Sequence, residues 1–214
     1  MPGGLIEPLP RNLTDTTRVL VRLPGAKGVA NHPLAGELAG VSVEAALPIR
    51  RFYSWKGKRN YEGRWWCSTS GGHVEFESLL ERDALMIADF DVDIFAVAAQ
   101  PLAFLWPRHI KGSTYHVPDF FVRLSNGDGR IVDVKRHAAV GSSEAQFALT
   151  RAACNEIGWQ YEVFTGDSAD LRQERPLAVW LPPGSVCTSR RHFVGNHRCF
   201  HETHGASCRR PTGG

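Results

Sequence analysis

Three acidic residues and one lysine have the types and the order that suit hydrolysis of a phosphodiester: Glu81, Asp119, Asp133 and Lys135. This reaction needs hydroxide near neutral pH and positive charge beside a phosphate whose negative charge grows in the transition state. A divalent ion held by carboxylate oxygens provides both. We therefore expect the chain to converge these acids on one metal ion.

The two aspartates lie on a predicted β-hairpin. The runs TYHVPDFFVRL and RIVDVKR are separated by SNGDG, and its Asn-Gly and Asp-Gly pairs tolerate the positive φ angles that tight hairpins require. A turn at 125–129 places residue 119 roughly opposite residue 135. Side chains two residues apart on a strand share a face, so Asp133 and Lys135 are predicted to point the same way.

The second strand of this hairpin supplies most of the expected chemistry. Asp133 would bind the metal, and the backbone carbonyl of Val134 is available as a further oxygen ligand. Lys135 would orient the attacking water and stabilise the charge that develops on the phosphate. Taken alone, however, Asp133 and Lys135 also fit an ordinary solvent-facing strand pair, and Asp119 fits an exposed strand carboxylate.

The remaining acid is expected on a helix. The segment HVEFESLLERDALMIADFD (73–91) has apolar residues at three- and four-residue spacing, which predicts an amphipathic helix with Glu77 and Glu81 on its polar stripe. The run Ser78-Leu79-Leu80-Glu81 also fits a capping box. Glu81 is therefore either a metal ligand or only a cap of its own helix.

The rest of the pattern predicts a mixed α/β fold. DIFAVAAQPLAFLW is rich in β-forming residues, and Gln100-Pro101 suggests an edge, a bulge or a strand break within it. SSEAQFALTRAACNEIG is predicted to be a helix that starts at Ser142 or Ser143 and stops at Gly158, followed by the strand WQYEVFTG. Strand, helix and strand in succession imply a right-handed parallel crossover. We expect a mixed sheet flanked by helices.

Three parts are distinguished along the chain. Residues 1–49 carry many Pro and Gly residues without a sustained period, which suggests a loosely folded arm. Residues 50–183 form the α/β domain and begin with a predicted β-hairpin at 50–67. Residues 184–214 are rich in Gly, Ser, Arg and His, so disorder is expected there.

The segment RRFYSWKGKRNYEGRWWC (50–67) is the candidate DNA contact, since its cations alternate with aromatic residues. Such a ribbon can hold phosphates and stack on bases. The alternative is a half-buried hairpin whose cations extend to solvent. Its basic residues are Arg50, Arg51, Lys56, Lys58, Arg59 and Arg64. Gln100 is a possible orienting residue, or a plain strand-end glutamine.

Composition excludes little. The chain has 43% hydrophobic residues, 22% charged residues and a net charge of +3, so overall charge says nothing about nucleic acid. No run long enough to span a bilayer and no signal peptide are apparent, and the odd number of cysteines favours reduced thiols, so we expect a soluble, cytoplasmic protein.

Histidines and cysteines in the tail suggest zinc, but their spacing matches no standard finger and adventitious binding is the alternative. His116 and His137 are candidate proton carriers or surface histidines.

One resemblance joins these features. Pro118-Asp119 followed by Asp133-Val134-Lys135 is similar to the PD-(D/E)xK motif of the restriction-endonuclease-like superfamily. The longer runs ESLLERDALMIADFDVDIFAVAAQP and HVPDFFVRLSNGDGRIVDVKR resemble the TnsA-like endonuclease subunit of heteromeric cut-and-paste transposases. The resemblance covers roughly residues 50–165.

The resemblance implies a restriction-endonuclease-like fold and a role for each motif residue. The glutamate upstream of the Gln-Pro step is catalytic in that family, and counting back from Gln100 selects Glu81 rather than Glu77. The aspartate and lysine of the family fall on Asp119 and Lys135. The tail does not align with the C-terminal regions of relatives.

It also implies a biological setting. Family members use Mg²⁺, for which Mn²⁺ is expected to substitute. They nick one strand of double-stranded DNA at transposon ends, leaving a 5′-phosphate and a 3′-hydroxyl, while a DDE-type transposase subunit nicks the other strand. An AAA+ ATPase regulator is a further expected partner, and no membrane is involved. The alternatives are a stand-alone nuclease in restriction, repair or phage defence, and a catalytically silent DNA-binding assembly subunit.

Overall fold

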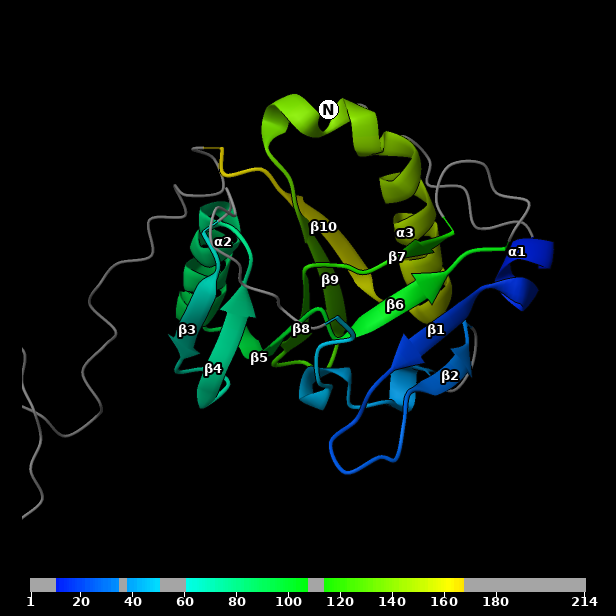
Figure 1. Cartoon of the computed structure of the whole chain (residues 1–214), viewed down its shortest axis with the longest axis horizontal. Helices are drawn as coiled ribbons and strands as arrows, with labels where there is room; N and C mark the ends of the chain where they lie inside the picture. The colour runs from blue at the N-terminus through cyan, green and yellow to red at the C-terminus, as the bar shows by residue number, and fades with distance from the viewer. Residues whose placement is uncertain (1–10, 35–37, 51–60, 108–113, 168–214) are drawn as a thin grey trace, which may run out of the picture. The chain divides into compact units, whose positions relative to one another are not determined.

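The computed structural model describes residues 11–34, 38–50, 61–107 and 114–167, whose strands form three sheets (Figure 1). The chain divides into two units, Met1–Glu174 and Arg175–Gly214, and every described residue belongs to the first. The mixture of helices and strands confirms the predicted α/β class. Within the described ranges, no helix is long and apolar enough to cross a bilayer.

The central sheet has the strand order β10-β9-β8-β5. Its strands are β5 (Ile94–Ala99), β8 (Phe120–Leu124), β9 (Gly129–Val134) and β10 (Gln160–Phe164). The predicted hairpin is confirmed, since β8 and β9 are antiparallel and Gly127 in the turn has a φ of +92°. The predicted crossover is also confirmed in direction, because β10 runs parallel to β9 after helix α3 (Glu144–Ile157). That helix ends as expected at Gly158, whose φ is +87°.

The second sheet corrects the expectation of a loosely folded arm. Its order is β2-β1-β6-β7, and two of its strands come from the first 49 residues. The elements are β1 (Arg18–Val21), β2 (Ala30–Pro33), β6 (Leu102–Leu105) and β7 (Tyr115–His116), with α1 (Arg11–Thr16), η1 (Leu38–Gly40) and η2 (Val43–Ala45) beside them in sequence. Val19 and Val21 are fully buried. Strands of four residues are too short to show a sustained period, which explains the wrong prediction.

Gln100-Pro101 is the predicted strand break. β5 ends at Ala99 in the central sheet, and β6 begins at Leu102 in the second sheet. The run TYHVPDFFVRL divides in the same way, because β7 pairs with β6 whereas β8 pairs with β5 and β9. The chain therefore passes between the two sheets at Gln100 and again before Asp119.

A separate ribbon precedes the first long helix. β3 (Gly63–Cys67) pairs with β4 (Gly72–Phe76), and α2 spans Leu79–Phe90. Two predictions are corrected here. The strand at 63–67 pairs with residues 72–76 rather than with the residues after 50, and the helix starts at Leu79 rather than at His73. Residues 51–60, the remainder of the predicted 50–67 hairpin, lie outside the described residues.

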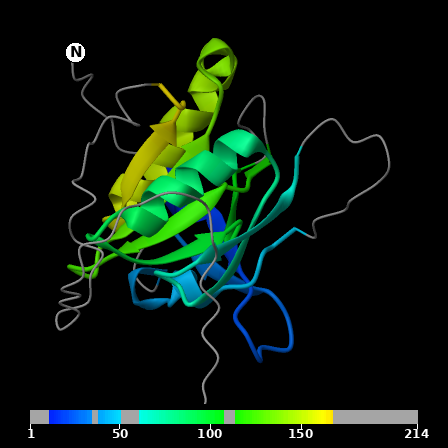
Figure 2. The same ribbon diagram turned by 90° about the vertical axis from the view of Figure 1, so that its left-hand side faces the viewer.

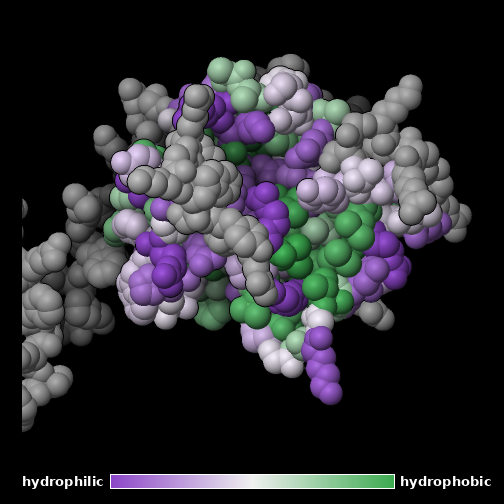
Figure 3. All heavy atoms as spheres, in the orientation of Figure 1, coloured by the Kyte–Doolittle hydropathy of each residue, from purple (hydrophilic) through white to green (hydrophobic). Residues whose placement is uncertain are grey.

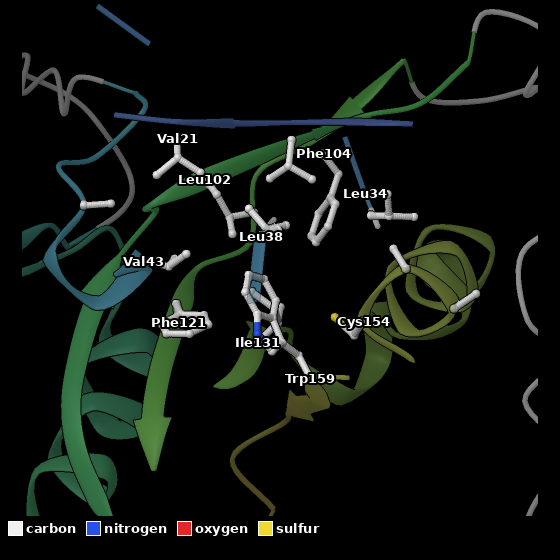
Figure 4. Close-up of a cluster of buried hydrophobic side chains, with 14 of the residues drawn as sticks. Val21, Leu34, Leu38, Val43, Leu102, Phe104, Phe121, Ile131, Cys154 and Trp159 are labelled. Carbon is white, nitrogen blue, oxygen red and sulfur yellow. The ribbon is translucent and has the colours of Figure 1, made fainter. Parts of the chain in front are cut away.

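Two hydrophobic cores lie on opposite faces of the central sheet, with α2 on one side and α3 on the other (Figures 1 and 2). Phe121 and Ile131 face the second sheet and α3, together with Phe104 and Trp159 (Figure 4). The intervening residues Phe120, Val122 and Val132 pack on the α2 side. Odd-numbered side chains of β8 and β9 thus face α3, and even-numbered ones face α2.

The second sheet has an outer face as well. Figure 3 shows apolar residues gathered over β1 and β6, bordered by hydrophilic residues. The outward-facing Leu20 and Leu105 are only half-buried.

Candidate active site

Strand ends meet at one edge of the central sheet, and the predicted site residues lie there. The register pairs Ala99 with Phe120, Phe120 with Val132, and Val134 with Phe164. Gln100, Asp119 and Lys135 are the residues next to these strand ends in the chain. The first turn of α2 approaches the same edge, since a Cβ on Gly166 would come within 2.5 Å of Leu80 Cδ1.

Asp119 is bound to the strand that carries the second half of the motif. Its Oδ2 accepts a 2.7 Å hydrogen bond from the Val134 backbone N–H, and its carbonyl accepts one of 2.9 Å from Gln100 N–H. Burial and repulsion from Glu81 and Asp133 raise the pKa of Asp119 to about 8, although the Val134 hydrogen bond and Arg50 lower it. This carboxyl is therefore costly to ionise without added positive charge.

Glu81 is the third residue of α2 and takes part in the cap at its N-terminus, where Ser78 is the N-cap. Ser78 Oγ accepts from Glu81 N–H at 3.2 Å and donates to Glu81 Oε1 at 2.8 Å. Glu81 Oε2 accepts from Glu77 N–H at 2.7 Å. Burial and the neighbouring Glu77 raise the pKa of Glu81, against these hydrogen bonds and the attraction of Arg50. The capping interpretation is confirmed, and the cap also fixes where this carboxylate lies.

Glu81 and Asp119 form an electrostatically coupled pair. Repulsion from Glu81 is the largest contribution after burial to the raised pKa of Asp119. A divalent cation between them would cancel this repulsion. No group of three His, Cys, Asp or Glu side chains within the described part of the chain is arranged to hold a metal ion. Asp119 thus interacts electrostatically with both other expected acids, but the three do not converge as one set of ligands.

Arg50 lies among these acids rather than on an exposed ribbon strand. Its Nε donates to Gln100 Oε1 at 3.2 Å, and its Nη2 lies 3.1 Å from Glu77 Oε2. Its guanidinium lowers the pKa of both Glu81 and Asp119. Arg50 therefore supplies positive charge to Glu81 and Asp119 without any metal ion.

Gln100 connects the elements of this edge. It is 1% exposed and has a φ of +46°, alone among the described non-glycine residues in taking a positive value. Its carbonyl accepts from Ile49 N–H and its side-chain oxygen accepts from Arg50, while its amide nitrogen is buried without a partner among the described residues. Backbone strain of this kind concentrates at functional sites.

Asp133 lies on the opposite face of β9 from the α2 core. The observed register places residue 119 level with 133, not with 135 as expected, because Phe120 pairs with Val132. Asp133 is 3% exposed, and His116 Nε2 and the Tyr161 hydroxyl contact its oxygens. Its carboxylate is therefore engaged away from Glu81.

Lys135 directly follows β9 at the shared edge. Its backbone N–H donates to Phe164 O at 2.9 Å, and its side chain is half-buried. Among the described residues, none makes a hydrogen bond or ion pair with its ammonium group. The carbonyl of Val134 belongs to the same segment, which the Val134 N–H joins to Asp119.

The ribbon is attached to α2 through Asp89. This carboxylate accepts hydrogen bonds from Trp65 Nε1 at 3.0 Å and from Ser68 Oγ and Thr69 N–H, each at 2.9 Å. Although burial alone raises it, these hydrogen bonds lower the pKa of Asp89 well below its ordinary value. The arrangement leaves Trp66 exposed on the outer face.

Several predicted contacts can be placed only in part. Arg64 is exposed on β3. The other predicted DNA contacts (Arg51, Lys56, Lys58 and Arg59) and the whole tail lie outside the described residues. Of the two histidines, His137 is at the surface as one alternative had it, whereas His116 is buried.

Sequence reasoning missed two sets of functional contacts. Arg50, predicted on the ribbon, instead joins the acids, and Glu77, two residues before α2, was the available signal for its ion pair. The His116, Asp133 and Tyr161 cluster was also missed, because three residues from three strands carry no local pattern.

The comparison with protein families gives a direct match. Residues 91–166 match the family model described as TnsA-like endonuclease N terminal. The matched segment contains Gln100, Asp119, Asp133 and Lys135, and it spans the hairpin, α3 and β10. No curated protein matches the chain. The resemblance to TnsA-like endonucleases is thereby confirmed over residues 91–166.

Proposed function

We propose that this chain is the metal-dependent DNA endonuclease subunit of a heteromeric transposase and hydrolyses phosphodiesters at transposon ends. One observation carries the proposal most: Glu81, from a separate element, raises the pKa of the buried Asp119 at the edge where the family motif lies. Paired carboxylates of this kind are suited to a shared divalent cation.

The residues present suit Mg²⁺ and, in its place, Mn²⁺. Glu81 and Asp119 would hold the ion, with the carbonyl of Val134 as a neutral oxygen ligand. When bound, such an ion supplies Lewis-acid stabilisation of the phosphate and a hydroxide near neutral pH. Asp133 was expected to belong to this set, and it would have to leave its present hydrogen bonds to do so.

The chain's own residues supply the remaining charge. Lys135, at the end of β9, would orient the attacking water and stabilise the phosphate as its negative charge grows. Arg50, held by Gln100, adds a second cation beside the same acids. Hydrogen bonds from Ser78 and Val134 fix the two carboxylates, so little reorganisation is needed when substrate binds.

The restriction-endonuclease-like fold is part of the proposal. An antiparallel hairpin carrying the motif, followed by a crossover helix and a parallel strand, supports it. Double-stranded DNA is the proposed substrate, with Arg64 and Trp66 of the ribbon among its contacts. A DDE-type transposase subunit and an AAA+ ATPase are the proposed partners, through the family resemblance.

A catalytically silent DNA-binding subunit is the second candidate. It is favoured by one observation: within the described ranges, three metal-binding side chains do not form a group. Calorimetric titration with Mg²⁺ distinguishes the two candidates. A nuclease should bind the ion through Asp119 and lose that heat in Asp119→Asn, whereas a silent subunit should show no heat that depends on Asp119.

Nicking of duplex DNA that carries transposon ends, with Mg²⁺ and the cognate transposase, tests the proposed activity. Asp119→Asn and Lys135→Ala should each lower the rate by about 100-fold or more. The matched controls are Asp15→Asn and Lys27→Ala, which change exposed residues and should nick like wild type. Equal rates for wild type and Asp119→Asn would reject the function, and nicking by the chain alone would favour a stand-alone nuclease.

A further inference from the structure

We propose that Asp133 is a positioning residue rather than a metal ligand: it anchors the end of β9 through His116 and Tyr161. The inference deepens the proposed nuclease function and rests on it for its activity measurements. It departs from the role that the motif predicts for this aspartate.

Asp133 and Glu81 lie on opposite sides of the central sheet. Asp133 shares its face of β9 with Ile131, which belongs to the core beneath the second sheet and α3. Glu81 belongs to α2, whose core contains the even-numbered neighbours Val132 and Val134. The two carboxylates therefore approach the sheet from opposite faces, and only Asp119 lies at the edge between them.

Both oxygens of the Asp133 carboxylate have partners inside the protein. His116 Nε2 lies 3.0 Å from Oδ1 and 2.9 Å from Oδ2 of Asp133, and the Tyr161 hydroxyl donates to Oδ2 at 2.6 Å. A carboxylate only accepts, so Nε2 of His116 carries the proton in this contact. The carboxylate of Asp133 thus has donors of its own within the protein, in a buried site.

The partners of Asp133 are themselves held in place. His116 is on β7, which pairs with β6, and its Nδ1 contacts the amide of Gln146 on α3. Tyr161 is on β10, and the guanidinium of Arg151 lies 5.4 Å from the centre of its ring. Asp133 therefore joins β9 to the second sheet, to β10 and, through His116, to α3.

The consequence for the site follows from chain connectivity. The residue after Asp133 donates the hydrogen bond to Asp119, and the next is Lys135. Fixing the carboxylate of Asp133 on the α3 side fixes the peptide that presents Val134 and Lys135 at the edge. A substitution of Asp133 should therefore lower the rate of cleavage, although the proposed metal ligands Glu81 and Asp119 are still present.

The test uses Mn²⁺ binding, followed by the loss of the free-ion electron paramagnetic resonance signal, together with Mg²⁺-dependent nicking. Asp133→Asn should weaken Mn²⁺ binding much less than Asp119→Asn does, because only the latter removes a charged oxygen ligand. Asp133→Ala and Tyr161→Phe should both slow nicking, and Asn at 133 should restore part of it because its oxygen still accepts from Tyr161. Asp128→Asn, in the exposed turn of the same hairpin, is the matched control.

Two results would overturn the inference: a loss of Mn²⁺ affinity in Asp133→Asn as large as that in Asp119→Asn, or tighter Mn²⁺ binding in Tyr161→Phe, which frees the carboxylate. Failure of the nuclease function looks different, since wild type would then neither bind Mn²⁺ nor nick DNA. In that case thermal unfolding still tests the anchor. The losses in melting temperature of Asp133→Ala and Tyr161→Phe should be less than additive in the double variant, and full additivity would contradict the anchor.

Discussion

The backbone N–H of Val134 donates a 2.7 Å hydrogen bond to the carboxylate of Asp119, which joins the two motif strands where both reach the edge of the sheet. This contact keeps one oxygen of Asp119 oriented toward β9, beside the carbonyl of Val134 and the start of the Lys135 side chain. This hydrogen bond lowers the pKa of Asp119, whereas burial and repulsion from Glu81 and Asp133 raise it. The site is thus organised around an acid whose ionisation needs a positive partner.

The first prediction concerns pH and folding of the metal-free protein. The pKa of Asp119 rises from its ordinary 3.8 to about 8 on folding. Between these values the folded protein holds a proton that the unfolded chain has lost, so the free energy of unfolding should fall as pH rises through this window. Denaturant unfolding with a chelator at about pH 5 and about pH 8 measures this. Asp119→Asn should reduce the decline, Asp15→Asn should keep it, and equal declines in wild type and Asp119→Asn would contradict the assignment.

The second prediction separates the two roles of Glu81. Ser78→Ala removes the helix cap and should lower the free energy of unfolding by about 1 kcal/mol. Glu81→Gln keeps an oxygen that can accept from Glu77 N–H, so it should cost little stability. Because it removes the charge that would hold the metal, it should lower nicking by about 100-fold or more. Urea unfolding and nicking assays on the same samples give the comparison, with the exposed Glu144→Gln as control; an active Glu81→Gln would leave Glu81 as a cap alone.

The third prediction concerns the cation among the acids. Arg50→Gln removes a charge that lowers the pKa of Glu81 and Asp119, so both pKa values should rise. Above the pKa of Asp119, Mn²⁺ should bind about tenfold more tightly, because like-charge repulsion from the guanidinium is gone. Mn²⁺ titration measures this. Arg64→Gln, exposed on β3, should bind as wild type does, and unchanged affinity in Arg50→Gln would argue against a shared electrostatic site.

The fourth prediction concerns attachment of the ribbon to α2. Asp89→Asn weakens several hydrogen bonds to β3 and its turn and should lower the free energy of unfolding by about 1 kcal/mol, less than for a fully buried acceptor because solvent reaches the carboxylate. The lowered pKa of Asp89 means that its stabilisation is present at neutral pH and is lost as pH falls below the ordinary value of 3.8. Thermal unfolding at about pH 7 and about pH 3 should show a smaller difference between wild type and Asp89→Asn at the lower pH. A difference of the same size at both pH values would point to packing instead.

Features fixed by local chemistry were predictable from the sequence. The turn at 125–129 and the stop of α3 at Gly158 depend on glycines that readily adopt a positive φ, and the break at Gln100-Pro101 depends on a proline that lacks an N–H. Pairing between distant segments was not predictable. β1 pairs with β6, and strands of four residues do not specify a partner by themselves.

The site shows the same division. Alternation along β9 predicts two sets of side chains, but it does not say which set faces which helix. That choice depends on Ile131 packing beneath the second sheet, and it turns Asp133 toward His116. Glu81 and Asp119 were predicted together through the family motif, and their coupling depends on the meeting of α2 with the sheet edge, which no local pattern encodes.

The central claim is that Glu81 and Asp119 hold one divalent ion. Anomalous diffraction from crystals of the protein grown with Mn²⁺ tests it most directly, because it locates the ion without reference to activity. The account predicts one strong peak within about 2.2 Å of a carboxylate oxygen from each of these two residues. A peak elsewhere, or none at an Mn²⁺ concentration that supports DNA nicking, would contradict it.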